Sequence, residues 1–239
     1  MTQPATRRPG LLQEIRNIAT SVAVAEPEPP AVVLRRRIVV AVVLVIGAVL
    51  LGYSLSREPG DNSFFWLTLV LAAVWAVGSL VSGPLHLGRL QLRGRNQRPV
   101  ITGILVGVLV ACAFLLGGMV ARQIPGVAEY AVRVLEFTNQ GAFPLVVLVT
   151  VLNGAAEELY FRGALYTALG KTHPAVISTL VYIAVILATG NPLLAFGAIV
   201  LGIVCVYERR ITGGVLAPML THFFWGLIMV LALPAVFGL

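Results

Sequence analysis

The sequence predicts an all-α polytopic transmembrane helix bundle of about seven spans, with the N-terminus in the cytosol. Three observations support this fold class. Hydrophobic residues make up 58% of the 239-residue chain and charged residues only 11%, a balance typical of integral membrane proteins. The apolar residues gather in segments about as long as a membrane helix needs. The basic residues are unevenly distributed between the connecting loops, and this asymmetry predicts the orientation.

The first 34 residues are predicted to form a mobile cytosolic tail. They lack a long apolar stretch and contain the proline-rich run Glu26–Pro30, a composition that disfavours a packed core. A short surface helix is predicted within the tail, around residues 11–24. Residues 35–142 are predicted to form an N-terminal transmembrane region with three spans and an interfacial segment.

Seven apolar segments are predicted to cross the membrane. The fifth and sixth are short, and Gly190-Asn191-Pro192 between them is a turn signal. Residues 122–141 mix charged and apolar side chains, which predicts an interfacial helix or a cap over the bundle. Gly103 and Gly107 form a small-xxx-small pair that permits close helix packing. The predicted spans are 38–55, 64–83, 101–121, 143–166, 174–190, 192–207 and 213–237.

The arginines predict the orientation. With the N-terminus inside, 14 of the 17 basic residues fall on the cytosolic side, and only Arg57, Arg122 and Arg133 fall outside. The positive-inside rule therefore predicts N-in and C-out. The net charge of +7 is explained by this topology, and no nucleic-acid motif accompanies it. We expect membrane lipids as partners, with the loop 86–98 lying along the anionic inner surface, and no nucleic acid.

The run Glu157-Glu158-Leu159-Tyr160-Phe161-Arg162 places two carboxylates and a guanidinium inside a predicted span. A charged side chain at the bilayer centre costs about 2.5–3.5 kcal/mol on insertion scales, so these groups are expected to face a protein interior or a wet cavity. Glu158 and Arg162 are four residues apart and can pair on one helix face. Glu157 lies about 100° further around the helix, where it can act on water or substrate. A buried ion pair that only fixes helix register is the alternative interpretation.

His222 is the second polar feature of the spans. It lies nine residues from Gly213, about 13 Å deep at the rise of a helix. Glu157 lies about nine residues from the end of its own span near Tyr166, so both side chains are predicted to reach a similar depth from the same side. His222 is therefore a candidate partner of Glu157 for activating water or stabilising an oxyanion. A histidine that only hydrogen-bonds a neighbouring helix is the alternative.

These residues resemble a known family. The run Glu157–Arg162 is similar to the Glu-Glu-x-x-x-Arg motif of the CAAX-protease and bacteriocin-processing intramembrane endopeptidases. The stretch Ile211–Pro218, which leads into His222, extends the resemblance over about residues 143–237. We therefore expect residues 143–239 to form a CAAX-protease-like core. The resemblance implies that Glu157 is the base that activates the hydrolytic water, with Glu158 and Arg162 as supporting groups.

Two positions depart from the family pattern. The second motif, Phe-x-x-x-His, is best matched by Tyr182–Ile186, which ends in isoleucine, and the third, His-x-x-x-Asn/Asp, begins at His222 but ends at Gly226. Neither isoleucine nor glycine offers a side-chain hydrogen bond. The loss of one oxyanion donor typically costs a hydrolase about 2.7–4 kcal/mol. The polar residues that remain as candidates to compensate are Tyr182, Thr189, Asn191, Thr221 and Asn153.

Three functions are consistent with this pattern. The first is an intramembrane endopeptidase that hydrolyses peptide bonds of membrane-associated or lipidated proteins through water activated by Glu157. The second, motivated by Ile186 and Gly226, is a pseudoprotease that binds or scaffolds membrane partners. The third is a small transporter, which the lack of an inverted repeat and of a second set of span acids disfavours.

The sequence predicts no cofactor. A divalent metal ion is the disfavoured alternative, because Glu157 and Glu158 face different ways and no His-Glu-x-x-His motif is present. The basic composition and the lack of organelle signals predict a bacterial cytoplasmic membrane. The expected partner is a membrane-protein or lipidated-peptide substrate.

Overall fold

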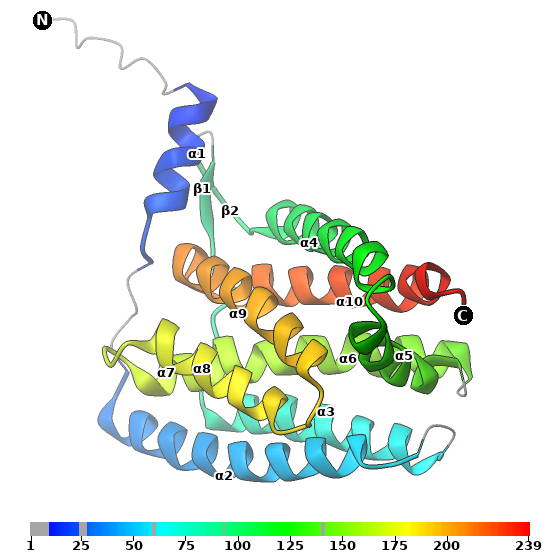
Figure 1. The fold of residues 1–239 in the computed structure, drawn as a ribbon. Coiled ribbons are helices and arrows are strands. Elements are labelled where there is room, and N and C mark those ends of the chain that lie inside the picture. The colour runs from blue at the N-terminus through cyan, green and yellow to red at the C-terminus, as the bar shows by residue number, and fades with distance from the viewer. Residues whose placement is uncertain (1–9, 24–27, 59–60, 93, 140–141) are drawn as a thin grey trace, which may run out of the picture.

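The computed structural model describes residues 10–23, 28–58, 61–92, 94–139 and 142–239. It confirms the predicted all-α fold (Figure 1). A π-helical segment, Leu159–Leu165, lies between α6 and α7. In chain order the other elements are α1 (Leu11–Thr20), α2 (Pro30–Leu55), α3 (Ser63–Ser82), β1 (Leu90–Leu92), β2 (Arg95–Gln97), α4 (Val100–Ala121), α5 (Pro125–Asn139), α6 (Phe143–Glu158), α7 (Tyr166–Leu169), α8 (Pro174–Leu187), α9 (Pro192–Thr212) and α10 (Leu216–Phe237).

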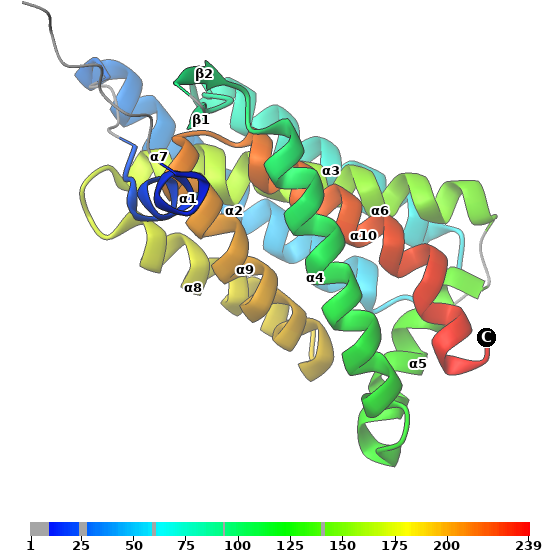
Figure 2. The same cartoon turned by 90° about the horizontal axis from the view of Figure 1, so that it is seen from above.

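The helices pack in layers. Helices α2 and α3 form one layer, α6 packs on α3, and α10 packs on the opposite side of α6 (Figure 1). Figure 2 shows α4 lying over α10, and α9 packs beside α10. Helix α5 covers one end of the bundle, which we call the α5 end. The opposite end carries the short β1–β2 hairpin and is called the hairpin end. This arrangement places α6 at the centre, between the two outer layers.

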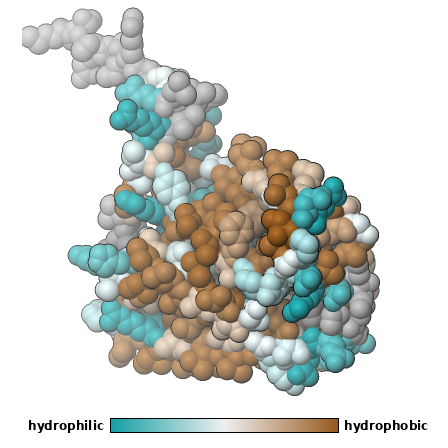
Figure 3. All heavy atoms as spheres, viewed as in Figure 1, coloured by the Kyte–Doolittle hydropathy of each residue, from teal (hydrophilic) through white to brown (hydrophobic). Residues whose placement is uncertain are grey.

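Within the described residues, six helices are long and apolar enough to cross a membrane: α2, α3, α4, the continuous stretch Phe143–Leu169, α9 and α10. The predicted fifth span is α8, whose 14 residues are fewer than the roughly 20 that a membrane helix needs. Much of the outer surface is apolar, as Figure 3 shows for one face. These helices make the chain an integral membrane protein, while N-in orientation and a bacterial location stay predictions.

The predicted small-residue pair brings α4 close to α10. A Cβ atom on Gly103 would lie 2.7 Å from the carbonyl oxygen of Ala217, and one on Gly107 would lie 2.6 Å from that of Thr221. The Thr221 hydroxyl donates a hydrogen bond to the Gly103 carbonyl at 3.0 Å. Glycine at both positions therefore permits the close backbone approach, which fixes the part of α10 that carries His222.

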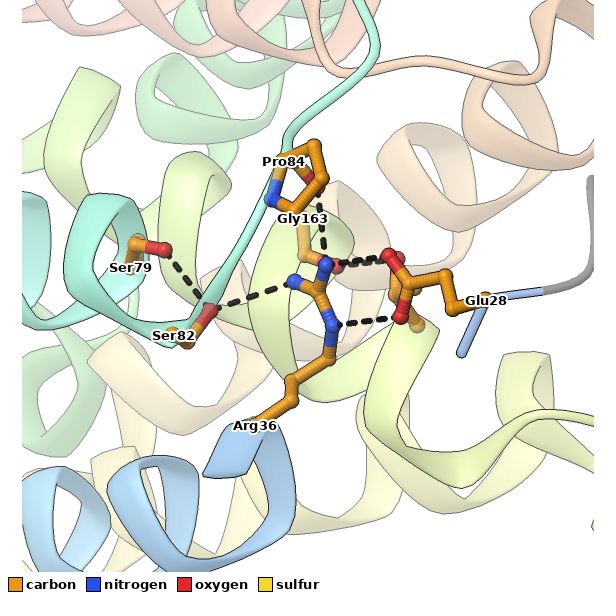
Figure 4. Close-up of polar contacts among 7 residues, drawn as sticks. Glu28, Arg36, Ser79, Ser82, Pro84 and Gly163 are labelled. Atoms are coloured by element: carbon orange, nitrogen blue, oxygen red, sulfur yellow. Dashed lines mark hydrogen bonds and ion pairs between the residues drawn. The ribbon is translucent and has the colours of Figure 1, made fainter. Parts of the chain in front are cut away.

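Arg36 ties the segment before α2 to the bundle (Figure 4). Its guanidinium is fully buried and donates to both carboxylate oxygens of Glu28, at 3.0 and 2.5 Å. It also donates to the Ser82 hydroxyl at 3.1 Å and to the Pro84 carbonyl at 2.9 Å. These partners satisfy the buried charge of Arg36 inside α2, which begins at Pro30, eight residues before the predicted start of the first span.

The predicted surface helix of the tail is α1. It packs beside α9, where the Tyr207 hydroxyl donates to the Ala19 carbonyl at 2.6 Å and the Ala23 amide donates to Arg210 at 3.0 Å. Residues 1–9 and 24–27 of the predicted mobile tail lie outside the described residues. The division of the chain at residues 34 and 142 stays a prediction.

The loop 86–98 is ordered by backbone pairing. His86 and Leu87 accept hydrogen bonds from the amides of Val215 and Leu216, and the Arg89 amide donates to Thr212 at 2.8 Å. Leu90–Leu92 and Arg95–Gln97 then pair as the antiparallel strands β1 and β2 of the hairpin. This loop therefore fixes the entry to α10, while its position along an anionic membrane surface stays a prediction.

Candidate active site

The acidic run lies where α6 becomes the π-helical segment Leu159–Leu165. Segments of π-helix are rare in proteins, and those that do occur often lie at functional sites. Aromatic packing holds the segment against the first layer: Tyr160 donates its hydroxyl to the Val40 carbonyl at 2.7 Å, and Phe161 lies 5.3 Å from Trp75 between ring centroids. The backbone that carries Glu157 and Glu158 is therefore rigidly placed at the centre of the bundle.

The Glu158–Arg162 ion pair predicted from the spacing is present. Oε1 of Glu158 accepts a hydrogen bond from Nη1 of Arg162 at 3.0 Å, and both side chains are 0% exposed. Nη2 of Arg162 donates to the Gly202 carbonyl at 3.1 Å, and the guanidinium lies 4.5 Å from the ring centroid of Tyr182. A buried charge needs such partners, because an unpaired one is strongly destabilising.

His222 pairs with the second glutamate, whereas the sequence predicts a partnership with the first. Its Nδ1 lies 3.0 Å from Oε1 of Glu158. Because an ionised carboxylate can only accept a hydrogen bond, Nδ1 is the donor in this pair. Depth along the helices brought the two side chains to the same level, but the rotation of α6 turns Glu158 rather than Glu157 toward this ring.

Glu157 has a different partner. Its Oε2 accepts a hydrogen bond from the Tyr182 hydroxyl at 3.2 Å, so Tyr182 is the one of the five compensating candidates that contacts this carboxylate. The other four bond to backbone. Thr189 donates to Ile186, Thr221 to Gly103, Asn191 to Tyr130, and Asn153 to Thr68 and Val149.

A cavity of about 990 Å³ opens in front of these groups. Glu157, Tyr182 and His222 line it, and so do Ile186 and Gly226, the two departures from the family pattern. The rest of the wall is mainly apolar and comes from α2, α4, α5, α8, α9 and α10. A large apolar cavity with a few convergent polar groups is the usual form of a ligand or substrate site. All four predicted site residues thus lie at or directly behind one cavity wall.

Trp225 is a cavity residue that the sequence analysis missed. Its ring centroid lies 5.6 Å from that of His222, and its Nε1 is buried with no hydrogen-bond partner in the described part of the chain. An indole nitrogen is a donor only. Its position three residues after His222, on the same face of α10, is the signal that identifies it.

Acidic and histidine side chains are also the usual ligands of a catalytic metal ion. Across the described residues, no three His, Cys, Asp or Glu side chains come together in a way that could hold a metal ion. Glu158 and His222 do meet, but Arg162 binds the same carboxylate oxygen as the histidine. The residues present do not form the three-ligand set that a catalytic zinc ion usually takes.

Residues 139–228 match the family model for type II CAAX prenyl endopeptidase Rce1-like proteins. This region is similar to those proteins, and we call it the Rce1-like domain. It contains Glu157, Glu158, Arg162, Tyr182 and His222, and the match confirms the resemblance found in the sequence. Comparisons with curated proteins and with solved structures gave no match. The family supports an intramembrane, CAAX-type protease-like role for the Rce1-like domain.

Gly154 provides the space for the imidazole, and its replacement by Ala is expected to displace His222. A Cβ atom at Gly154 would lie 2.8 Å from Cδ2 of His222, and overpacking of this kind typically costs about 1–3 kcal/mol. We expect a lower midpoint of thermal unfolding for the purified variant. Gly117→Ala in α4 is the matched control, because beyond the adjacent backbone of its own helix no described atom lies within 4 Å of the added methyl group. Equal midpoints for the two variants would contradict the prediction.

Proposed function

We propose that the chain is an intramembrane endopeptidase that hydrolyses a peptide bond of a membrane-associated or lipidated protein, with Glu157 as the general base. The observation that carries this proposal is the contrast between the two acids. Glu157 lines the 990 Å³ cavity with a neutral hydroxyl as its hydrogen-bond partner, whereas Glu158 is buried between Arg162 and His222. The Rce1-like domain supports the same reaction class.

In this mechanism Glu157 takes a proton from water, and the oxygen of the water attacks the carbonyl carbon of the peptide bond. The intermediate carries an oxyanion, and Glu157 returns the proton to the leaving nitrogen as the C–N bond breaks. The products are a new carboxyl terminus and a new amino terminus. General-base catalysis of this kind contributes about 10²–10⁴-fold to a rate.

Tyr182 and His222 divide the remaining tasks. With Nδ1–H directed at Glu158, Nε2 of a neutral His222 accepts a hydrogen bond from the water and orients it, but it cannot donate to the oxyanion. The Tyr182 hydroxyl can donate. Once Glu157 is protonated, it no longer holds this hydroxyl as an anion would, and the hydroxyl is available to the developing oxyanion.

A pseudoprotease is the second candidate function, and the cavity wall favours it. Ile186 and Gly226 both line the cavity. The family that the sequence resembles has a histidine at the first position and an asparagine or aspartate at the second. The apolar cavity would then bind a transmembrane helix or lipidated tail without cleaving it.

A comparison of protein termini distinguishes the two functions. The N- and C-termini of membrane proteins are identified in cells with the native chain, with the Glu157→Gln variant, and without the chain. Termini that are found with the native chain, but are missing both with Glu157→Gln and without the chain, support proteolysis through Glu157. Identical termini in all three cells, with the native chain well expressed, would reject the endopeptidase and favour the pseudoprotease.

Tyr182→Phe is expected to lower the cleavage rate constant by about 10²–10³-fold, the usual effect of losing one oxyanion donor. The ring and its contact with Arg162 are retained, so only the hydroxyl bound to Glu157 is lost. Rates are measured on a substrate found by the comparison of termini. Tyr207→Phe is the control, since its hydroxyl bonds to Ala19 outside the cavity. A native rate for Tyr182→Phe would remove Tyr182 from the mechanism.

A further inference from the structure

A second pocket lies at the α5 end, where α2 and α8 finish and α9 begins. Its volume is about 380 Å³, and Arg57, Arg133 and Glu136 are its ionisable wall residues. It adjoins the apolar cavity in front of Glu157. The wall residues common to both spaces are Leu55, Val134, Thr189 and Leu194. A polar pocket walled by α5 and by the ends of α2, α8 and α9 therefore continues into an apolar cavity, which these helices line together with α4, α6 and α10.

The two arginines leave much of their hydrogen-bonding capacity unused. No carboxylate of the described residues forms an ion pair with either of them. Arg57 lies 4.2 Å from the ring centroid of Tyr53, donates weakly to Ser56 at 3.3 Å, and has a buried Nε with no partner. Arg133 lies 5.5 Å from the ring centroid of Tyr130. Two arginines against one glutamate give the pocket wall a formal charge of +1.

We propose that the two spaces together bind an anionic amphiphile, a phosphate ester with a long hydrocarbon chain. The phosphate lies at Arg57 and Arg133, and the chain enters the cavity toward Glu157. Guanidinium groups match the oxygens of phosphate in charge and geometry. Arg57 lies just beyond the end of α2, at the level where a span leaves the hydrocarbon core and lipid headgroups begin.

The ligand class follows from both spaces and not from the charge alone. The pocket by itself would accept any small anion, but the neighbouring 990 Å³ cavity is mainly apolar and favours a hydrocarbon chain. A bound chain occupies the space in front of Glu157 and Tyr182. This site is independent of the proposed hydrolysis, because a pseudoprotease with the same cavity would bind the same lipid.

Trp225 lines the cavity and serves as the reporter, since bromine atoms on an acyl chain quench indole fluorescence at short range. The exposed Trp66 is first replaced by Phe, so that quenching from outside the bundle is reduced. The full chain in detergent is titrated with phosphatidylglycerol carrying dibrominated chains, and separately with the matching phosphatidylcholine. We expect half-maximal quenching at a clearly lower concentration of the anionic lipid.

Variants identify the headgroup contacts. Arg57→Gln combined with Arg133→Gln is expected to raise the half-maximal concentration of phosphatidylglycerol at least about tenfold, because two charge-assisted contacts are lost. Arg122→Gln is the matched control. Its side chain bonds to Val236 at the same end of the bundle, outside the polar pocket, and we expect no change.

Three results would overturn the proposal. Equal quenching by the two lipids would show that chains enter the cavity without headgroup selection. An unchanged titration of the Arg57 and Arg133 double variant would place the headgroup elsewhere. Competition by inorganic phosphate at the same concentrations as the lipid would show that the pocket binds a free anion and that the chain contributes nothing. Selective binding that the double variant loses and phosphate does not displace supports the proposal.

Discussion

Replacement of Glu157 by Gln is expected to slow peptide cleavage at least about a hundredfold and to leave the fold intact. The amide oxygen of Gln can still accept the Tyr182 hydrogen bond, but the amide cannot take a proton from water. The expected loss follows from the 10²–10⁴-fold contribution of a general base. The measurement is the single-turnover cleavage rate in liposomes, on a substrate identified from the comparison of termini.

Stability separates this role from the alternative of a purely structural acid. The Glu157 side chain is only half-buried, and its described hydrogen-bond partner is a hydroxyl, so loss of its charge should not lower the midpoint of thermal unfolding. A substantially lower midpoint would indicate that Glu157 helps to hold the fold. Glu129→Gln on the exposed face of α5 controls for the loss of one acid. Cleavage by Glu157→Gln at the native rate would exclude Glu157 as the base.

The fold could be predicted from the sequence because the lipid environment limits it. Long apolar segments in a membrane must be helices, and every predicted span is a helix in the structure. The start of α2 could not be predicted. The three consecutive arginines at 35–37 are typical of a polar loop. Arg36 nevertheless points into the bundle, where Glu28, Ser82 and Pro84 surround its guanidinium. These partners are distant in the sequence, and hydropathy does not identify them.

The site was predicted in part. Four-residue spacing was enough to identify the Glu158–Arg162 pair, because helix geometry alone brings such side chains together. The partner of His222 depends on how α10 is rotated against α6, and depth along a span contains no such information. Because the sequence does not give the rotation of the helices, it leaves Tyr182 as one of five candidates to compensate for the missing polar groups. The structure distinguishes it because the other four hydrogen-bond to backbone carbonyls, whereas Tyr182 reaches Glu157.

Arg162→Met is expected to destabilise the protein by about 3–5 kcal/mol, the usual cost of removing one partner from a buried ion pair. Glu158 is 0% exposed and would then face His222 without a permanent positive charge beside it. The Gly202 carbonyl would also lose its donor. The free energy of unfolding is measured by denaturant titration in mixed micelles. Arg133→Met is the control, because this exposed arginine forms no ion pair within the described residues.

A double variant tests whether the cost comes from the stranded charge. If Met replaces Glu158 as well as Arg162, no charge remains buried at this position, and we expect a large part of the lost stability to return. The recovery should be incomplete, since Nδ1 of His222 then has no carboxylate partner. A double variant no more stable than Arg162→Met would show that packing, not charge pairing, explains the loss. A folded double variant also lacks the group that fixes the His222 ring, so it should cleave slowly even with Glu157 in place. The ion pair would then contribute to folding and to water activation through one shared oxygen of Glu158.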